Sequence, residues 1–159
     1  IVRDLDDDAA TIIMVDSNLQ RESLLPSERA FAYKMKLEAV KHQGARTDLT
    51  SVQIEQKLNS REEVAAKTGE SASAIQRYIR LTYLIDPLLD MVDTGKPGFA
   101  AGVDLSFLSR REQEDLLRVM QEEEKVPNGA QAKALRKASA AGMLTGPSFA
   151  RKAVRSPAS

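Results

Sequence analysis

Apolar side chains recur every three or four positions along most of the chain, which is the spacing of one helix face. The clearest case begins at Pro26, a residue suited to a first helical turn, and is predicted to end at Gly44. The residues of its expected buried face are Ala30, Tyr33, Leu37 and Val40. Strand-like alternation does not extend beyond the opening Ile1-Val2-Arg3. The pattern therefore predicts an all-α protein of about seven to nine helices.

Helix start and stop signals divide this pattern into regions. Ser60 and Glu63 form an S-x-x-E capping box, and Ser109 and Glu112 form another. The sequence VPNG at 126–129 interrupts the helical pattern again. The predicted regions are an N-terminal helical part (1–58), a helix-turn-helix region (59–103) and C-terminal helices with a basic tail (104–159).

The stretch SREEVAAKTGESASAIQRYIRL, residues 60–81, has the pattern of a DNA-reading helix-turn-helix. Ala65 is small enough for two helices to cross closely, and Gly69 tolerates the positive φ of a tight turn. Ile75 is expected to face inward, against Val64. The residues expected on the outward, DNA-binding side of the second helix are Ser71, Ser73, Ala74, Gln76, Arg77 and Arg80.

This outward set suits a major groove. The outward side chains in the first turn of the helix are small. The long ones that follow include Gln, which pairs with adenine, and Arg, which pairs with guanine or phosphate. Arg80, at the far end, is expected to meet a phosphate. The alternative is a structural corner, because helix–Gly–helix sequences are common. DNA binding is favoured because no acid follows Glu70 on the second helix.

The charge distribution supports a nucleic-acid partner although the formal net charge is zero. Residues 1–16 and 104–124 are acidic, and no acid occurs from Lys125 onward. The basic residues of that last segment are Lys125, Lys133, Arg136, Lys137, Arg151, Lys152 and Arg155. Because a polyanion meets a surface rather than a total charge, a basic face is expected here.

Composition removes several other classes of function. The chain has no Cys, which excludes disulfides and thiolate metal sites and fits a cytoplasmic protein. His42 is the single histidine, too few for a His-rich metal site or a His-based triad. No apolar run approaches the roughly 20 residues of a membrane span. Without a nucleophile–base pair, Walker loop or metal-ligand spacing, we expect no catalysis and no metal site in this chain.

A second motif lies in MVDSNLQRESLLPSERAFAYKMKLE, residues 14–38. This stretch resembles the ParB family of bacterial partition proteins, which carry a Glu-Asn-x-Gln-Arg motif, a short Leu-Pro or Asn-Pro segment and then a helix. The matching residues are Asn18, Gln20, Arg21, Pro26, Glu28, Ala32 and Tyr33. The helix-turn-helix follows at the distance expected for the family, so the resemblance covers about residues 1–100.

The resemblance implies a homodimer that binds a palindromic, centromere-like site in double-stranded DNA and works with a Walker-type partition ATPase. It also implies a clamp closed by CTP and magnesium, with Asn18 and Arg21 at the triphosphate. Ser17 stands where the family has an acidic magnesium ligand, and the family's Gly-Glu-Arg-Arg segment is absent. We therefore expect CTP and magnesium to act in a longer protein, with an N-terminal part preceding Ile1, rather than in this chain alone.

Three other functions fit the same residues. One is a transcriptional regulator of a plasmid, phage or integrative element that uses the same helix-turn-helix. Another is a nucleotide-hydrolysing switch that includes residues 14–25. The last is a helical interaction module that binds no DNA.

Overall fold

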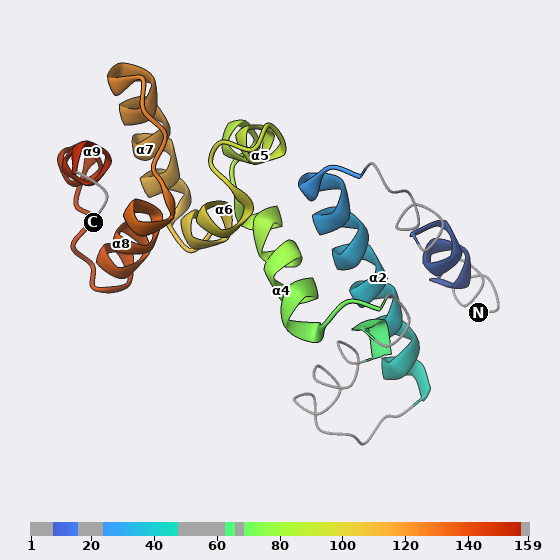
Figure 1. The fold of residues 1–159 in the computed structure, drawn as a ribbon. Helices are drawn as coiled ribbons and strands as arrows, with labels where there is room; N and C mark the ends of the chain where they lie inside the picture. The colour runs from blue at the N-terminus through green and yellow to red at the C-terminus, as the bar shows by residue number, and fades with distance from the viewer. Residues whose placement is uncertain (1–7, 16–23, 48–62, 66–68, 157–159) are drawn as a thin grey trace. The chain divides into compact units, whose positions relative to one another are not determined.

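The computed structural model describes residues 8–15, 24–47, 63–65 and 69–156, and every regular element in these ranges is helical (Figure 1). The elements with defined bounds are α2 (Pro26–Thr47), α4 (Ala72–Arg80), the 3-10 turn η1 (Leu81–Tyr83), α5 (Asp86–Asp93), α6 (Phe99–Leu105), α7 (Arg110–Glu123), α8 (Gly129–Ala140) and α9 (Pro147–Arg155). Residues 8–15 and 63–65 are also helical. The all-α prediction is confirmed. None of the described helices is both long and apolar enough to cross a bilayer.

The chain forms two compact units, residues 1–79 and 80–159. Their boundary falls at the end of α4, inside the region 59–103 that was expected to form one part. The unit of residues 1–79 is called unit 1 below, and the unit of residues 80–159 is called unit 2.

The core of unit 1 is built on α2. All four residues of its expected buried face are at most 6% exposed, and three of them join Val64 and Ile75 in one apolar cluster. The helix continues three residues past Gly44, so the predicted end was wrong. A glycine inside a helix costs only about 1 kcal/mol relative to alanine, which does not force a helix to stop.

In unit 2, η1 is followed by α5, which ends at Asp93; Gly95, two residues later, adopts φ +91°. The next helix, α6, was not anticipated, because its centre is Gly102, a poor helix former. Its position explains the glycine: a Cβ there would lie 2.7 Å from a methyl carbon of Val92 and 3.4 Å from Leu81. Close packing of α6 against α5 and η1 therefore requires glycine despite its low helix propensity.

Helices α7 and α8 each begin with a capping box. Ser109 and Glu112 form the predicted capping box at the N-terminus of α7, and Asn128 forms a second one with Gln131 at the N-terminus of α8. The VPNG break thus contains the start signal of α8. Helix α8 packs on α6, and α9 packs on α7.

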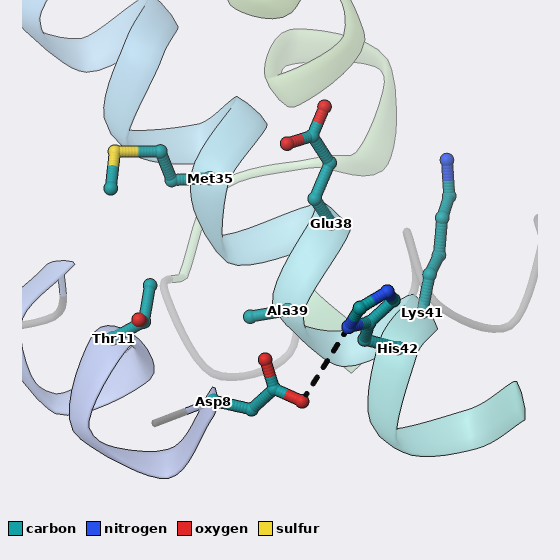
Figure 2. A pocket seen from close by; sticks show the side chains of 7 residues that line it. All are labelled: Asp8, Thr11, Met35, Glu38, Ala39, Lys41 and His42. Atoms are coloured by element: carbon teal, nitrogen blue, oxygen red, sulfur yellow. Dashed lines mark ion pairs between the residues drawn. The ribbon is translucent and has the colours of Figure 1, made fainter. Parts of the chain in front are cut away.

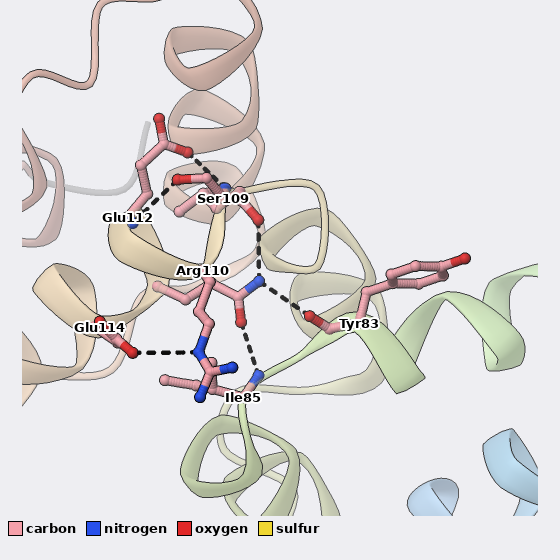
Figure 3. A network of polar contacts seen from close by, with 8 residues as sticks. Tyr83, Ile85, Ser109, Arg110, Glu112 and Glu114 are labelled. Carbon is pink, nitrogen blue, oxygen red and sulfur yellow. Dashed lines mark hydrogen bonds and ion pairs between the residues drawn. The ribbon is translucent and has the colours of Figure 1, made fainter.

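A buried side chain, Gln113 of α7, fixes the loop that precedes α5, and Figure 3 labels two of the residues whose backbone it bonds, Tyr83 and Ile85. Its carbonyl oxygen accepts from the backbone N–H of Ile85 at 2.8 Å. Its amide nitrogen donates to the backbone oxygens of Leu108 at 3.0 Å and Tyr83 at 3.2 Å. Gln113 is 1% exposed, so these bonds satisfy backbone groups that would otherwise be buried without partners.

Candidate nucleic-acid interface

The turn before α4 has the geometry that its sequence predicts. Gly69 adopts φ +75°, and its N–H donates to the backbone oxygen of Ala65 at 3.0 Å. Ser71 then caps α4: its Oγ accepts from the N–H of Ala74 at 3.1 Å, and its backbone oxygen accepts from Ile75 at 3.0 Å. Ser71 therefore satisfies the amide groups of Ala74 and Ile75 in the first turn of α4.

The inner side of α4 is held by apolar packing. Ile75 and Val64 are completely buried in the cluster on α2, with Ala65 packed against them. One turn further on, the ring of Tyr78 lies 5.6 Å from the ring of Tyr33, centroid to centroid. Burial raises the pKa of the Tyr33 phenol above its ordinary value, and the charge of Glu70 adds to this shift. This packing confirms that Ile75 faces inward and fixes which side of α4 faces outward.

The outer side of α4 is polar and exposed. Ser71, Ser73, Gln76 and Arg77 are exposed, as predicted, and Ala74 is half-buried. The acidic residue that precedes them, Glu70, pairs with Arg29 of α2 at 3.8 Å. Small side chains at the start of the helix and a Gln-Arg pair in its middle are the arrangement that a groove-reading helix needs.

Arg80 does not have the outward position predicted for it. It is half-buried; its Nε donates to the Oγ of Ser106 at 3.1 Å, and its Nη2 donates to the Ser106 backbone oxygen at 3.0 Å. The guanidinium carbon lies 3.9 Å from the centroid of the Phe107 ring and 4.6 Å from that of Tyr83. Burial lowers the pKa of Arg80; the nearby Tyr83 opposes this shift, and Arg136 reinforces it.

The C-terminal segment is less basic in three dimensions than in sequence. Arg136 pairs with Asp104 at 3.0 Å, Arg151 with Glu122 at 2.6 Å, and Arg155 with Glu123 at 2.7 Å. Three of the seven cations expected to form a basic face are thus matched by acids of the preceding helices. The exposed basic residues that remain are Lys125, Lys133, Lys137 and Lys152. The expectation of one acid-free face is corrected: α9 uses its arginines to dock on α7.

Glu123 is the centre of that docking contact. Its carboxylate accepts from Nε and Nη2 of Arg155 at 2.8 and 2.7 Å, and it lies 3.4 Å from Nε of Arg151. Hydrogen bonding to Arg155 lowers the pKa of Glu123 below its ordinary value; burial opposes the shift, and the charges of Arg155, Arg151 and Lys125 reinforce it. A two-bond fork of this kind gives the contact a defined geometry.

The residues that the family resemblance places at a nucleotide, Asn18 and Arg21, lie outside the described residues. Among the residues that are described, no three His, Asp or Glu side chains are grouped to hold a metal ion. The nucleotide prediction therefore stays a prediction.

A cavity of about 470 Å³ lies between the helical residues 8–15 and α2 (Figure 2). Met35 and Ala39 give it an apolar wall. The Nδ1 of His42 lies 3.7 Å from the Oδ2 of Asp8 at its edge, so the single histidine of α2 faces the helical residues 8–15. The charged side chains around the cavity are Asp8, Glu38, Lys41 and His42. Both signs of charge are present, and the arrangement selects no ligand class.

The sequence did not predict the contact of Arg80 with Phe107 and Ser106. Phe107 lies 27 residues beyond the end of α4, and no spacing rule connects positions so far apart. The only local signal was an aromatic residue in a polar stretch, SFLSRR, in a chain with only 4% aromatic residues.

Comparison of this chain with protein-family models, curated protein sequences and solved structures gave no match. The similarity to the ParB family therefore rests on the motif residues alone.

Proposed function

We propose that this chain binds duplex DNA sequence-specifically by placing the outer side of α4 in the major groove. The observation that carries the proposal is the division of α4 into two sides. Ile75 is buried in the core of unit 1, while Gln76 and Arg77, the next two residues, are exposed. A helix anchored by one side, with a Gln and an Arg on the other, presents the side chains that read adenine and guanine.

The start of α4 also suits this role. Ser71 caps the helix and Ser73 is exposed, so the end that would enter the groove first is narrow and carries hydroxyl groups. Glu70, the acid nearest to that end, is paired with Arg29 across 3.8 Å, which reduces its repulsion of a phosphate backbone.

The process in which the DNA is bound is proposed from the family resemblance. In a ParB-like protein the site is a palindrome that acts as a centromere, a homodimer binds it, and a Walker-type ATPase moves the complex during plasmid or chromosome partition. A regulator of transcription would use the same helix on an operator. Control of a neighbouring promoter, without any loss of plasmid or chromosome inheritance when the protein is deleted, would favour regulation.

The proposal is tested by replacing the outer residues of α4 individually. Gln76→Ala and Arg77→Ala should each weaken binding to the selected duplex by about 1–3 kcal/mol and relax specificity at one base pair. Both should leave the free energy of unfolding within about 0.5 kcal/mol of the original, because exposed substitutions have small effects.

The matched control is Arg118→Ala, which removes an exposed arginine from α7. It makes the same change in net charge without touching α4. Equal losses of DNA affinity in Arg77→Ala and Arg118→Ala would show that only overall charge matters, and would contradict recognition by α4.

A further inference from the structure

Two guanidinium groups lie over the ring of Phe107. The Cζ of Arg80 is 3.9 Å from the ring centroid and the Cζ of Arg136 is 3.6 Å from it. Phe107 remains 39% exposed. The result is a surface stack of three planar groups contributed by the end of α4, the turn after α6, and α8.

The stack carries more positive charge than its protein partners neutralise. Arg136 pairs with Asp104 at 3.0 Å, whereas both hydrogen bonds of Arg80 go to Ser106, which is neutral. Arginine stays protonated at neutral pH. Two cations and one carboxylate leave a net charge of one positive unit at the surface. Within the described part of the chain, no further acceptor takes the remaining N–H groups of either guanidinium.

A purely structural stack does not need this second cation. Cation–π contacts are common in proteins, and a single arginine on Phe107 would cover the ring. Holding two like charges around one ring opposes their charged forms: burial lowers the pKa of Arg80 most, and the charge of Arg136 adds to this shift. An anion placed at the edge of the stack would relieve that repulsion and use the remaining donors.

We propose that Arg80, Phe107 and Arg136 form a second DNA-contact site that binds backbone phosphates without reading sequence. Guanidinium groups bind phosphate oxygens through paired N–H donors, and their ring partner holds them in place. Arg80 is the last residue of α4, one helical turn after Gln76. The stack therefore begins on the helix proposed to enter the groove. The inference rests on the proposed DNA binding and adds where the backbone is held.

The test compares Arg136→Ala with Arg110→Ala. Arg110 is a suitable control because it is also a surface arginine in a single ion pair, with Glu114 at 3.4 Å, so both variants lose one positive charge. Affinity is measured for the selected duplex and for an unrelated duplex at several salt concentrations. Arg136→Ala should lower both affinities by about five- to tenfold and reduce the salt slope by about one, while Arg110→Ala changes each by less than about twofold.

Further variants and buffers separate the remaining explanations. If Arg136→Ala melts early, Arg136→Gln, which can still donate to Asp104, gives the same comparison in a folded protein. Phe107→Leu should also weaken both duplexes, because the guanidinium groups lose the ring that positions them. Sodium phosphate at constant ionic strength should leave the effect of Arg136 unchanged. If the effect of the Arg136 substitution on duplex affinity disappears in phosphate buffer, the site binds a free anion, and the DNA assignment is overturned.

The outcomes for the two proposals are distinct. If Arg136→Ala and Arg110→Ala have equal affinities and salt slopes, the proposed phosphate site is overturned. DNA binding by α4 still stands in that case if Arg77→Ala loses affinity. A loss confined to the selected duplex would mean a base contact and would also overturn it. If the unaltered protein binds no duplex at low salt, both proposals fail.

Discussion

Arg77 of unit 1 and three arginines of unit 2 differ in their surroundings. On α4, within unit 1, Arg77 is exposed on the side opposite the apolar core. In unit 2, Arg136, Arg151 and Arg155 pair with acids of other helices, so much of their charge is used within the protein. The comparison shows that a count of basic residues along a sequence overestimates the charge that a DNA backbone meets.

The two units also differ in how their helices are held. In unit 1 the outward side of α4 is set by one fully buried residue, Ile75, in an apolar cluster on α2. In unit 2 close contact between helices depends on Gly102, and α9 is held by the arginine fork on Glu123. The effects of substitutions on stability should therefore differ between the two units, both in size and in their dependence on pH.

The largest effect is expected for Ile75→Ala, which removes the anchor of α4. Truncation of a fully buried isoleucine should lower the free energy of unfolding by roughly 2–5 kcal/mol. The neighbouring Gln76→Ala is the control, and its effect should stay within about 0.5 kcal/mol. Urea denaturation followed by circular dichroism measures both. Similar losses in the two variants would mean that α4 is not divided into a buried and an exposed side.

An intermediate effect is expected for Gly102→Ala in unit 2. The added Cβ would lie 2.7 Å from Val92, so the substitution should destabilise the protein by roughly 1–3 kcal/mol despite alanine's better helix propensity. The matched control is Gly129→Ala at the start of α8, where no atom lies within 4 Å of the added carbon. The second substitution Val92→Ala should recover part of the loss in Gly102→Ala. A Gly102→Ala variant as stable as the Gly129→Ala variant would disprove the close packing of α6.

The smallest effect is expected from the contact between Arg155 and Glu123. Because the pKa of Glu123 is lowered in the folded protein, the contact stabilises the fold fully above the carboxyl's ordinary value of 4.5. That contribution to stability should disappear as the pH falls from 4.5 through the lowered pKa of Glu123 in the folded protein. Melting temperatures from about pH 7 to pH 3 should therefore show a gap between the unaltered protein and Arg155→Ala that closes in acid. A gap that stays constant would show that Arg155 acts by packing rather than through the charge of Glu123.

Local signals in the sequence were sufficient for much of the fold and for the outer side of α4. The cap at Ser71, the turn at Gly69 and the capping box at Ser109 each depend on residues within four positions, so the sequence displays them directly. The buried side of α2 follows from its helical spacing. These same signals placed Gln76 and Arg77 on the surface.

Contacts between distant segments could not be predicted in this way. Arg80 was expected outward because its position on a helix wheel allowed it, whereas Ser106 and Phe107, far along the chain, provide its partners. The acids that neutralise α9 lie on α7, a separate helix with its own acidic pattern. Helix α6 was missed because the reason for Gly102 is a neighbour, Val92, rather than a local preference.

The central claim, sequence-specific DNA binding through α4, is tested most directly by selecting bound sequences from a pool of random duplexes. The account predicts that one sequence is enriched, that its affinity falls steeply as salt rises, and that Arg77→Ala protein no longer selects the same base at one position. A contradicting result would be a pool that stays random at low salt, or an enriched sequence that Arg77→Ala selects unchanged.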